Sequence, residues 1–103
     1  MSDQPIQLDL DAISNLSQIG FADKKIIFEQ SNDSCASIEL SLNRRICKGR
    51  HVITLEGRAF KQGEFVNWSL IGEHSPDLEG ISTILAACQA YSFSGMFELI
   101  THR

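Results

Sequence analysis

The stretch Val52–Ile71, VITLEGRAFKQGEFVNWSLI, decides the fold, because two runs of β-forming residues flank a turn. A four-residue loop, Lys61-Gln62-Gly63-Glu64, would set Phe60 opposite Phe65. This register gives one face the apolar pairs Ala59/Val66, Gly57/Trp68 and Leu55/Leu70, and the other face Phe60/Phe65, Arg58/Asn67 and Glu56/Ser69. The stretch therefore predicts an antiparallel hairpin with one face in the core.

Two further strands precede this hairpin. Residues 25–29 contain Ile26, Ile27 and Phe28 and end at a turn-forming Gln-Ser-Asn-Asp-Ser cluster. Residues 37–43 alternate strictly, with Ile38, Leu40 and Leu42 on one face and polar side chains on the other. Both segments indicate strands of the same sheet.

Helices are predicted at 11–18 and 76–91. Leu10, Ile13 and Leu16 have helical spacing, and Ser75-Pro76 starts a helix whose apolar stripe includes Leu85 and Cys88. Residues 96–101 read as a final strand. We expect one α+β domain over residues 1–103, an antiparallel sheet of four to five strands with the 76–91 helix on one face and a short N-terminal helix.

Composition favours a globular cytosolic protein. The chain has 103 residues and is 43% hydrophobic, with no apolar run long enough for a membrane span and no secretory signal at its start. Three cysteines cannot all pair within one chain, which favours a reducing compartment. We expect a cytoplasmic location.

Acidic and basic residues are concentrated in different segments of the chain. The formal net charge is −4, yet residues 44–62 contain six basic residues against the single acid Glu56. Residues 44–51, RRICKGRH, are too charged for a sheet interior and predict a long basic hairpin loop around Gly49. A local anion-binding patch fits this distribution better than a broad nucleic-acid surface does.

Sequence motifs give no catalytic machinery. Cys47 and His51 form one close pair of metal ligands, whereas structural zinc sites normally have two such pairs. Cys47 has basic neighbours and a nearby base but no orienting third group, and no glycine-rich phosphate loop follows a strand. We expect no metal, no cofactor and no enzymatic activity, with a redox protein or small enzyme using Cys47 as a third hypothesis.

The segment Asn67-Trp68-Ser69-Leu70-Ile71-Gly72 resembles the Asn/Asp-x-Ser-x-x-Gly element of PilZ domains. That resemblance implies a β-barrel that binds cyclic di-GMP with an upstream arginine pair. The upstream pair here would be Arg44 and Lys48, which departs from the family pattern, and only residues 73–103 remain for further barrel strands. The resemblance covers six residues, and we assign no family from it.

Two surfaces are candidates for binding a partner. The first is the basic loop, backed by Arg58 and Lys61, which suits phosphates or an acidic protein unless it is simply a solvated hairpin. The second is the polar face of the hairpin, where Phe60 and Phe65 lie beside Arg58 unless Leu8, Leu10 and Ile13 cover them. The candidate partner-binding residues are Arg44, Arg45, Lys48, Arg50, Arg58, Phe60, Lys61 and Phe65.

These observations predict a small acidic cytosolic protein-binding module that docks on a larger protein, as inhibitors, immunity proteins, anti-defence proteins and adaptors do. The alternative is binding of nucleic acid or a phosphorylated ligand through the basic loop 44–51. We expect no membrane association, and a homodimer is an open alternative.

Overall fold

The computed structural model describes residues 5–8 and 24–102. Four strands form one antiparallel sheet in the order β1-β2-β3-β4, and two helices follow them. The elements are β1 (Lys24–Ser31), β2 (Ala36–Cys47), β3 (Arg50–Lys61), β4 (Glu64–His74), α2 (Leu78–Gln89) and α3 (Phe93–Thr101). This confirms the antiparallel sheet with a packed helix that the sequence predicts.

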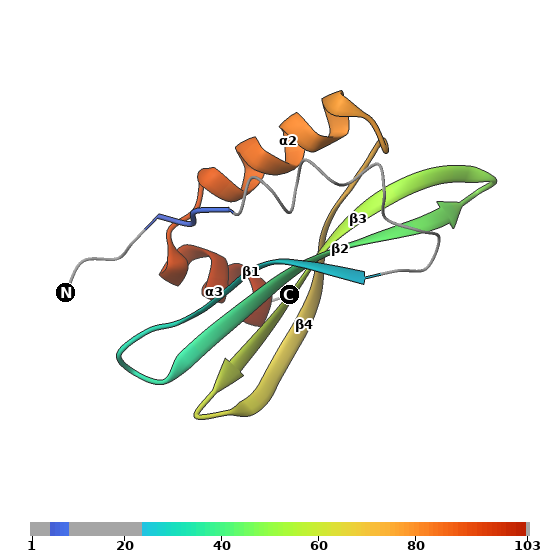
Figure 1. Cartoon of the computed structure of the whole chain (residues 1–103). Helices are drawn as coiled ribbons and strands as arrows, with labels where there is room; N and C mark the ends of the chain where they lie inside the picture. Colours follow the sequence, from blue (N-terminus) through green and yellow to red (C-terminus); the bar gives the residue numbers. More distant parts are fainter. Residues whose placement is uncertain (1–4, 9–23, 103) are drawn as a thin grey trace.

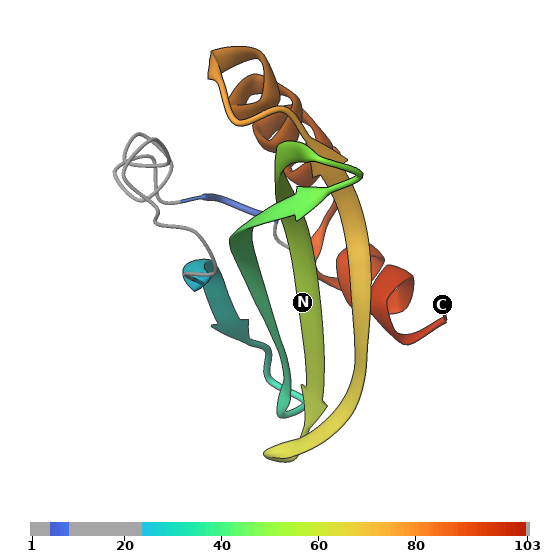
Figure 2. The ribbon, with the colours of Figure 1, turned by 90° about the vertical axis from the view of Figure 1, so that its right-hand side faces the viewer.

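Both helices lie on the same side of the sheet (Figure 1). Turned by 90°, the ribbon shows the strands in order from β1 to β4, with α2 and α3 next to β4 (Figure 2). Pro5 forms an isolated bridge with Ser92, which ties the described N-terminal segment to the connection between the helices. Neither described helix has the length and apolar character needed to cross a membrane.

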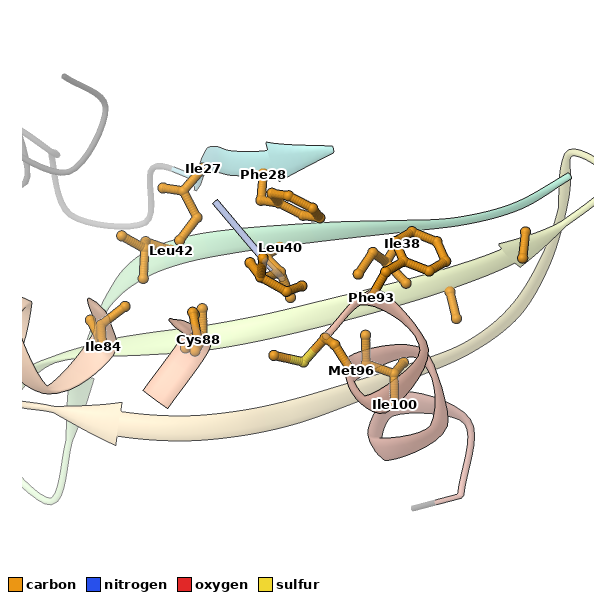
Figure 3. Close-up of a cluster of buried hydrophobic side chains, with 14 of the residues drawn as sticks. Ile27, Phe28, Ile38, Leu40, Leu42, Ile84, Cys88, Phe93, Met96 and Ile100 are labelled. Carbon is orange, nitrogen blue, oxygen red and sulfur yellow. The ribbon is translucent and has the colours of Figure 1, made fainter. Parts of the chain in front are cut away.

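The core lies between the sheet and these helices. Ile38, Leu40 and Leu42 of β2 are fully buried, and their predicted alternation places them all on the helix side. Figure 3 shows their side chains together with those of β1, α2 and α3. The cluster consists of Ile6, Ile27, Phe28, Ala36, Ile38, Leu40, Leu42, Ile53, Leu55, Ala59, Ile84, Cys88, Phe93, Met96 and Ile100.

The C-terminal part differs from the sequence prediction. Residues 96–101 are not a strand; they belong to α3, whose buried residues Phe93, Met96 and Ile100 follow helical spacing. The described residues form four strands in this sheet, so the fifth is not seen. The predicted helix at 11–18 lies outside the described residues.

Helix α2 begins later than the sequence indicates. Asp77, not Ser75, is its N-cap and accepts a hydrogen bond of 2.9 Å from the Gly80 backbone N–H. This bond, with a second one from the Ser75 hydroxyl, lowers the pKa of Asp77 below its usual value of 3.8.

Residues 44–51 are not a long loop. Strand β2 continues to Cys47 and β3 starts at Arg50, so only Lys48 and Gly49 form the turn. Their φ angles of 53° and 77° suit a two-residue turn with both central residues left-handed, which matches the twist of the strands. Apart from Lys48, the basic residues therefore belong to paired strands and alternate between the two faces of the sheet.

A β-bulge at Val66 changes the predicted register of the third and fourth strands. Phe60 does pair with Phe65, as predicted, but Ala59 then pairs with Asn67. The extra residue turns Trp68 and Leu70 to the face opposite the helices, where they pair with Arg58 and Glu56. The prediction that Trp68 packs over Gly57 in the core is therefore wrong.

Asn67 and Ser69 of β4 face the helices. The sequence prediction had placed Val66, Trp68 and Leu70 on that side instead. Both side chains donate hydrogen bonds to the backbone carbonyl of Ile100, at 2.8 Å and 2.9 Å, near the end of α3. The space above Gly57 is taken by the Ile100 side chain, since a Cβ atom there would lie 2.7 Å from Ile100 Cδ1. The strand thus holds the helix end with two polar side chains.

Candidate functional site

The face of the sheet opposite α2 and α3 carries the candidate site, and we call it the open face. Within residues 5–8 and 24–102, no helix covers it. Register places alternate residues of the strands on this face. On β2, β3 and β4, the residues of this face that form or adjoin the candidate site are Asn43, Arg45, Arg50, Val52, Thr54, Glu56, Arg58, Phe60, Phe65, Trp68, Leu70 and Glu73.

Glu56 lies at the centre of the open face and is bound by side chains from three strands. Its Oε2 atom accepts hydrogen bonds from Asn43 Nδ2, from Thr54 Oγ1 at 2.9 Å and from Arg45 Nη2 at 3.2 Å. Its Oε1 atom accepts one from Trp68 Nε1 at 3.1 Å. Four donors from three strands thus converge on this one carboxyl group.

The Glu56 side chain is only 10% exposed, although none of the described helices lies above it. Neighbouring side chains on the same face shield it, and Thr54 and Asn43 are buried with it. No buried side-chain nitrogen or oxygen atom in the described residues lacks a hydrogen-bond partner. The centre of the open face can thus lose water without leaving a charge unpaired.

Large apolar side chains lie on the open face as well, Trp68 and Leu70 beside Glu56 and Phe65 further along β4. Phe65 is 59% exposed, Trp68 46% and Leu70 41%, and the ring centroids of Phe60 and Phe65 are 6.0 Å apart in an edge-on arrangement. Single exposed apolar residues are normal, whereas a group of aromatic side chains on one face is typical of interaction surfaces. The open face therefore has the composition of a docking surface.

A shallow hollow of about 270 Å³ lies on the open face between the β2–β3 turn and β4. Val52, Trp68 and Leu70 give it apolar walls, while Glu56 and Glu73 add acidic groups. Its remaining lining residues are Arg45, Ile46, Cys47 and Thr54. The volume is below the usual range for small-molecule pockets, about 300–1,000 Å³, and suits a single large side chain.

A second hollow, of about 530 Å³, adjoins the first at the turn. It is lined by Lys48, Arg50, His51 and His74, with Glu73 as the acidic member and Cys47, Val52 and Ser75 completing it. Strand β4 pairs with β3 only from Ile53 onward, so β3 extends past β4 at this end. The hollow combines cations, imidazoles and one carboxylate.

The predicted partner-binding residues separate into groups. Five of them, Arg45, Arg50, Arg58, Phe60 and Phe65, share the open face, so the structure joins the basic and aromatic surfaces that the sequence treats as two. Lys48 lies in the turn, and Arg44 and Lys61 belong to the opposite row of side chains. Leu8, one residue predicted to cover the phenylalanines, instead packs against the core.

Sequence reasoning missed Trp68, Leu70 and the role of Glu56. The bulge at Val66 hides the first two, because period-two alternation counted from Phe65 assigns them to the core. Glu56 had a detectable signal: it lies in the alternating row Thr54, Glu56, Arg58 of a strand with a buried opposite face.

The structure also locates the cysteines and the PilZ-like segment. Cys35, Cys47 and Cys88 are free, and burial raises the pKa of the Cys88 thiol to about 11. Within the described ranges, no three histidine, cysteine, aspartate or glutamate side chains gather closely enough to hold a metal ion. Asn67 and Ser69, the polar residues of the PilZ-like segment, bond to Ile100 on the helix side.

Both edges of the sheet are interrupted by β-bulges. β1 carries one at Ile27, and β4 carries them at Val66 and Ile71. Bulges on edge strands disrupt the ladder of free hydrogen-bonding groups that another strand would join. Both edges of this sheet are therefore poorly suited to pairing with a further strand.

Comparison with known proteins finds no matching family model, no matching curated protein and no matching solved structure.

Proposed function

We propose that this chain is a cytosolic, non-enzymatic protein-binding module that docks on a larger protein through its open face. The observation that carries the proposal is that Phe65, Trp68 and Leu70 are exposed on one face of β4, with Trp68 bonded to the buried Glu56. Aromatic and arginine side chains are the usual anchors of protein interfaces. Arg58 pairs directly with Trp68 across the strands and supplies such a neighbour.

The free thiols support the cytosolic part of the proposal. All three cysteines are unpaired, and Cys35 is exposed. Oxidising compartments convert accessible thiols to disulfides, whereas the cytosol keeps them reduced.

A capture experiment with matched variants tests the proposal. Leu70→Glu places a charge on the open face, and Leu78→Glu makes the same change at an 81%-exposed position on α2. We expect wild type and Leu78→Glu to retain the same protein from host lysate at high salt, and Leu70→Glu to lose it. Binding of the purified partner is then measured by calorimetry.

Equal retention by Leu70→Glu and wild type, with both folded by circular dichroism, would overturn this proposal. The proposal would also be overturned if the wild-type chain retained no specific protein from the lysate.

The second candidate function is binding of nucleic acid or a phosphorylated ligand at the β2–β3 turn. The 530 Å³ hollow with Lys48, Arg50 and two histidines favours it. Against it, Arg44 and Arg45 point to opposite faces, and Glu73 lines the same hollow. Recovery of nucleic acid only at low salt, lost in Lys48→Glu/Arg50→Glu, would favour this function.

A further inference from the structure

We infer that a second copy of this chain occupies the open face of the free protein, and that the two copies pack face to face about a two-fold axis parallel to the strands. This inference goes beyond the proposed function, because it concerns the state of the chain before any other protein is bound. A docking partner then displaces the second copy. The inference depends on the order of residues across the strands, on the charge balance of the open face and on its area.

The register arranges the open face as four rows, each with one residue from every strand in the order β1, β2, β3, β4. The rows are Lys24-Asn43-Thr54-Glu73, Ile26-Ser41-Glu56-Leu70, Glu29-Glu39-Arg58-Trp68 and Ser31-Ser37-Phe60-Phe65. A two-fold axis between β2 and β3 sets each row against the same row in reverse order, so β1 faces β4 and β2 faces β3 of the second copy. Sheets packed face to face cross at about 30°, which shifts the two middle rows least.

Side-chain size is complementary under this reversal. The last row has serines on β1 and β2 and phenylalanines on β3 and β4, so Phe60 and Phe65 meet small side chains. In the second row, Ile26 faces Leu70 of the second copy, and these side chains are 44% and 41% exposed in the single chain. An axis across the strands would instead set each strand against itself, and the phenylalanine strands would then face one another. Large side chains therefore find room only under the parallel axis.

Charges are complementary in the same arrangement. In the third row, Glu39 faces Arg58 of the second copy, and Arg58 faces its Glu39. Within one copy Arg58 already lies opposite Glu39, and Lys24 Nζ is 3.1 Å from Glu39 Oε1. The two copies therefore place acids and bases alternately around the axis. In the first row, Lys24 and Glu73 are likewise set against each other.

The open face as a whole is neutral, which removes the repulsion that two acidic chains would otherwise have. The chain carries a formal net charge of −4, and the open face has as many cations as carboxylates, so the excess of acids lies elsewhere. These residues are Lys24, Arg45, Arg50 and Arg58, with Glu29, Glu39, Glu56 and Glu73. A neutral face with both signs of charge fits a copy of itself better than a strongly acidic or strongly basic surface.

The area of the face sets the strength of the dimer. All four strands run side by side from Thr54 to Phe60 of β3, which makes a face about 19 Å wide and about 24 Å long. With side-chain relief, two such faces bury about 1,000 Å² in total, the lower limit for a specific interface. We therefore expect a reversible dimer with a dissociation constant in the micromolar range, which a docking partner can displace.

Sedimentation equilibrium of the purified full-length chain tests the inference. We expect the average mass to rise from 11.5 kDa toward twice this value as the concentration passes through the micromolar range. Trp68 is the only tryptophan and is 46% exposed in the single chain. Its emission should shift to the blue over the same concentration range, because the indole loses water in the dimer.

Charge reversals in the third row identify the interface. Arg58→Glu and Glu39→Arg each set like charges against each other across the axis, and we expect each variant to weaken the dimer at least tenfold. An equimolar mixture of the two should restore a dimer, because one copy then presents two acids and the other two bases. Glu98→Arg, at an exposed position of α3, is the matched control and should change the association less than threefold. Circular dichroism checks that each variant is folded.

Three results would overturn the inference: a mass of 11.5 kDa at every concentration, a dimer that Arg58→Glu leaves intact, or a mixture of the two variants that stays monomeric. The docking function is decided separately by capture from lysate. A monomeric chain whose Leu70→Glu variant loses a retained protein would show that a different protein occupies the open face.

Discussion

Glu56 holds an unusual position for a glutamate, because it is buried on the face of the sheet that neither α2 nor α3 covers. Its four hydrogen bonds reach across β2, β3 and β4. The bond from Trp68 also orients the indole, whose ring then forms one wall of the hollow. One carboxylate thus contributes both to the stability of the sheet and to the shape of its surface.

Glu56→Ala tests the first of these contributions. The substitution leaves the buried Asn43 and Thr54 without their acceptor, and we expect a loss of roughly 2–3 kcal/mol in the free energy of unfolding, measured with urea. Glu39→Ala is the matched control, because its ion pair with Lys24 lies at the surface and is worth less than about 1 kcal/mol. Equal losses in the two variants would contradict a special role for Glu56.

Cys88 should be inert in the native protein. Burial raises its pKa to about 11 from 9.0, so the thiol stays protonated near neutral pH. We expect an aromatic disulfide reagent at pH 8 to label Cys35 and Cys47 rapidly and Cys88 only on unfolding. Because the folded pKa is the higher one, the contribution of Cys88 to stability is complete below pH 9 and is lost as the pH rises toward 11. Rapid labelling of all three thiols would refute its burial.

Elements with regular side-chain periods were predictable. Strand β2 follows from the alternation of Ile38, Leu40 and Leu42, and α2 follows from its apolar stripe. Helix α3 was missed, because the run from Met96 to Ile100 is short and apolar, a length at which strand and helix periods are hard to tell apart. Ser92, which caps α3 by accepting a hydrogen bond from Gly95, was its best sequence signal.

Helix α2 contains Gly80, and helix propensity alone would misjudge how this glycine affects stability. Alanine stabilises helix interiors relative to glycine by about 1 kcal/mol. A Cβ atom on Gly80, however, would lie 1.7 Å from the Ser75 carbonyl oxygen, a backbone atom. We expect Gly80→Ala to lower the thermal midpoint, with a loss of at least about 2 kcal/mol.

Gly95→Ala is the control for this prediction. Its Cβ atom would meet the Ser92 hydroxyl at 3.3 Å, a side-chain contact that can adjust, so we expect a small effect of either sign. A rise in the thermal midpoint for Gly80→Ala would show that the approach of Ser75 is not as close as described.

At the scale of the whole molecule, the candidate site depends on the sheet bringing distant residues together. Arg45 and Trp68 are far apart in sequence, yet both bond to Glu56. Five of the open-face residues were predicted from the sequence, but as members of two separate surfaces. It could not show that they coincide, because the actual strand lengths and the bulge at Val66 determine which face each residue occupies.

The rate of amide hydrogen exchange should be lower in the central strands than in the edge strands. Central strands β2 and β3 have neighbours on both sides, whereas β1 and β4 are bulged edges. We expect the amides of Leu40, Leu42 and Leu55 to exchange most slowly, and those of Arg50 to Val52, beyond the end of β4, to exchange orders of magnitude faster. Mass spectrometry of exchanged peptides measures this, and a turn as protected as the centre of β2 would contradict the pairing.

The bulge at Val66 has a consequence for how this protein can change over generations. Substitutions along β4 alter one contact at a time, but loss of a single residue next to Val66 would reverse every side chain from Asn67 to Leu70 at once. The indole would then be directed at α3, and two polar groups that hold the helix end would face water. Insertions and deletions at this point should therefore be far rarer than replacements, and a shortened homologue would be expected to have lost both its stability and the arrangement of its open face.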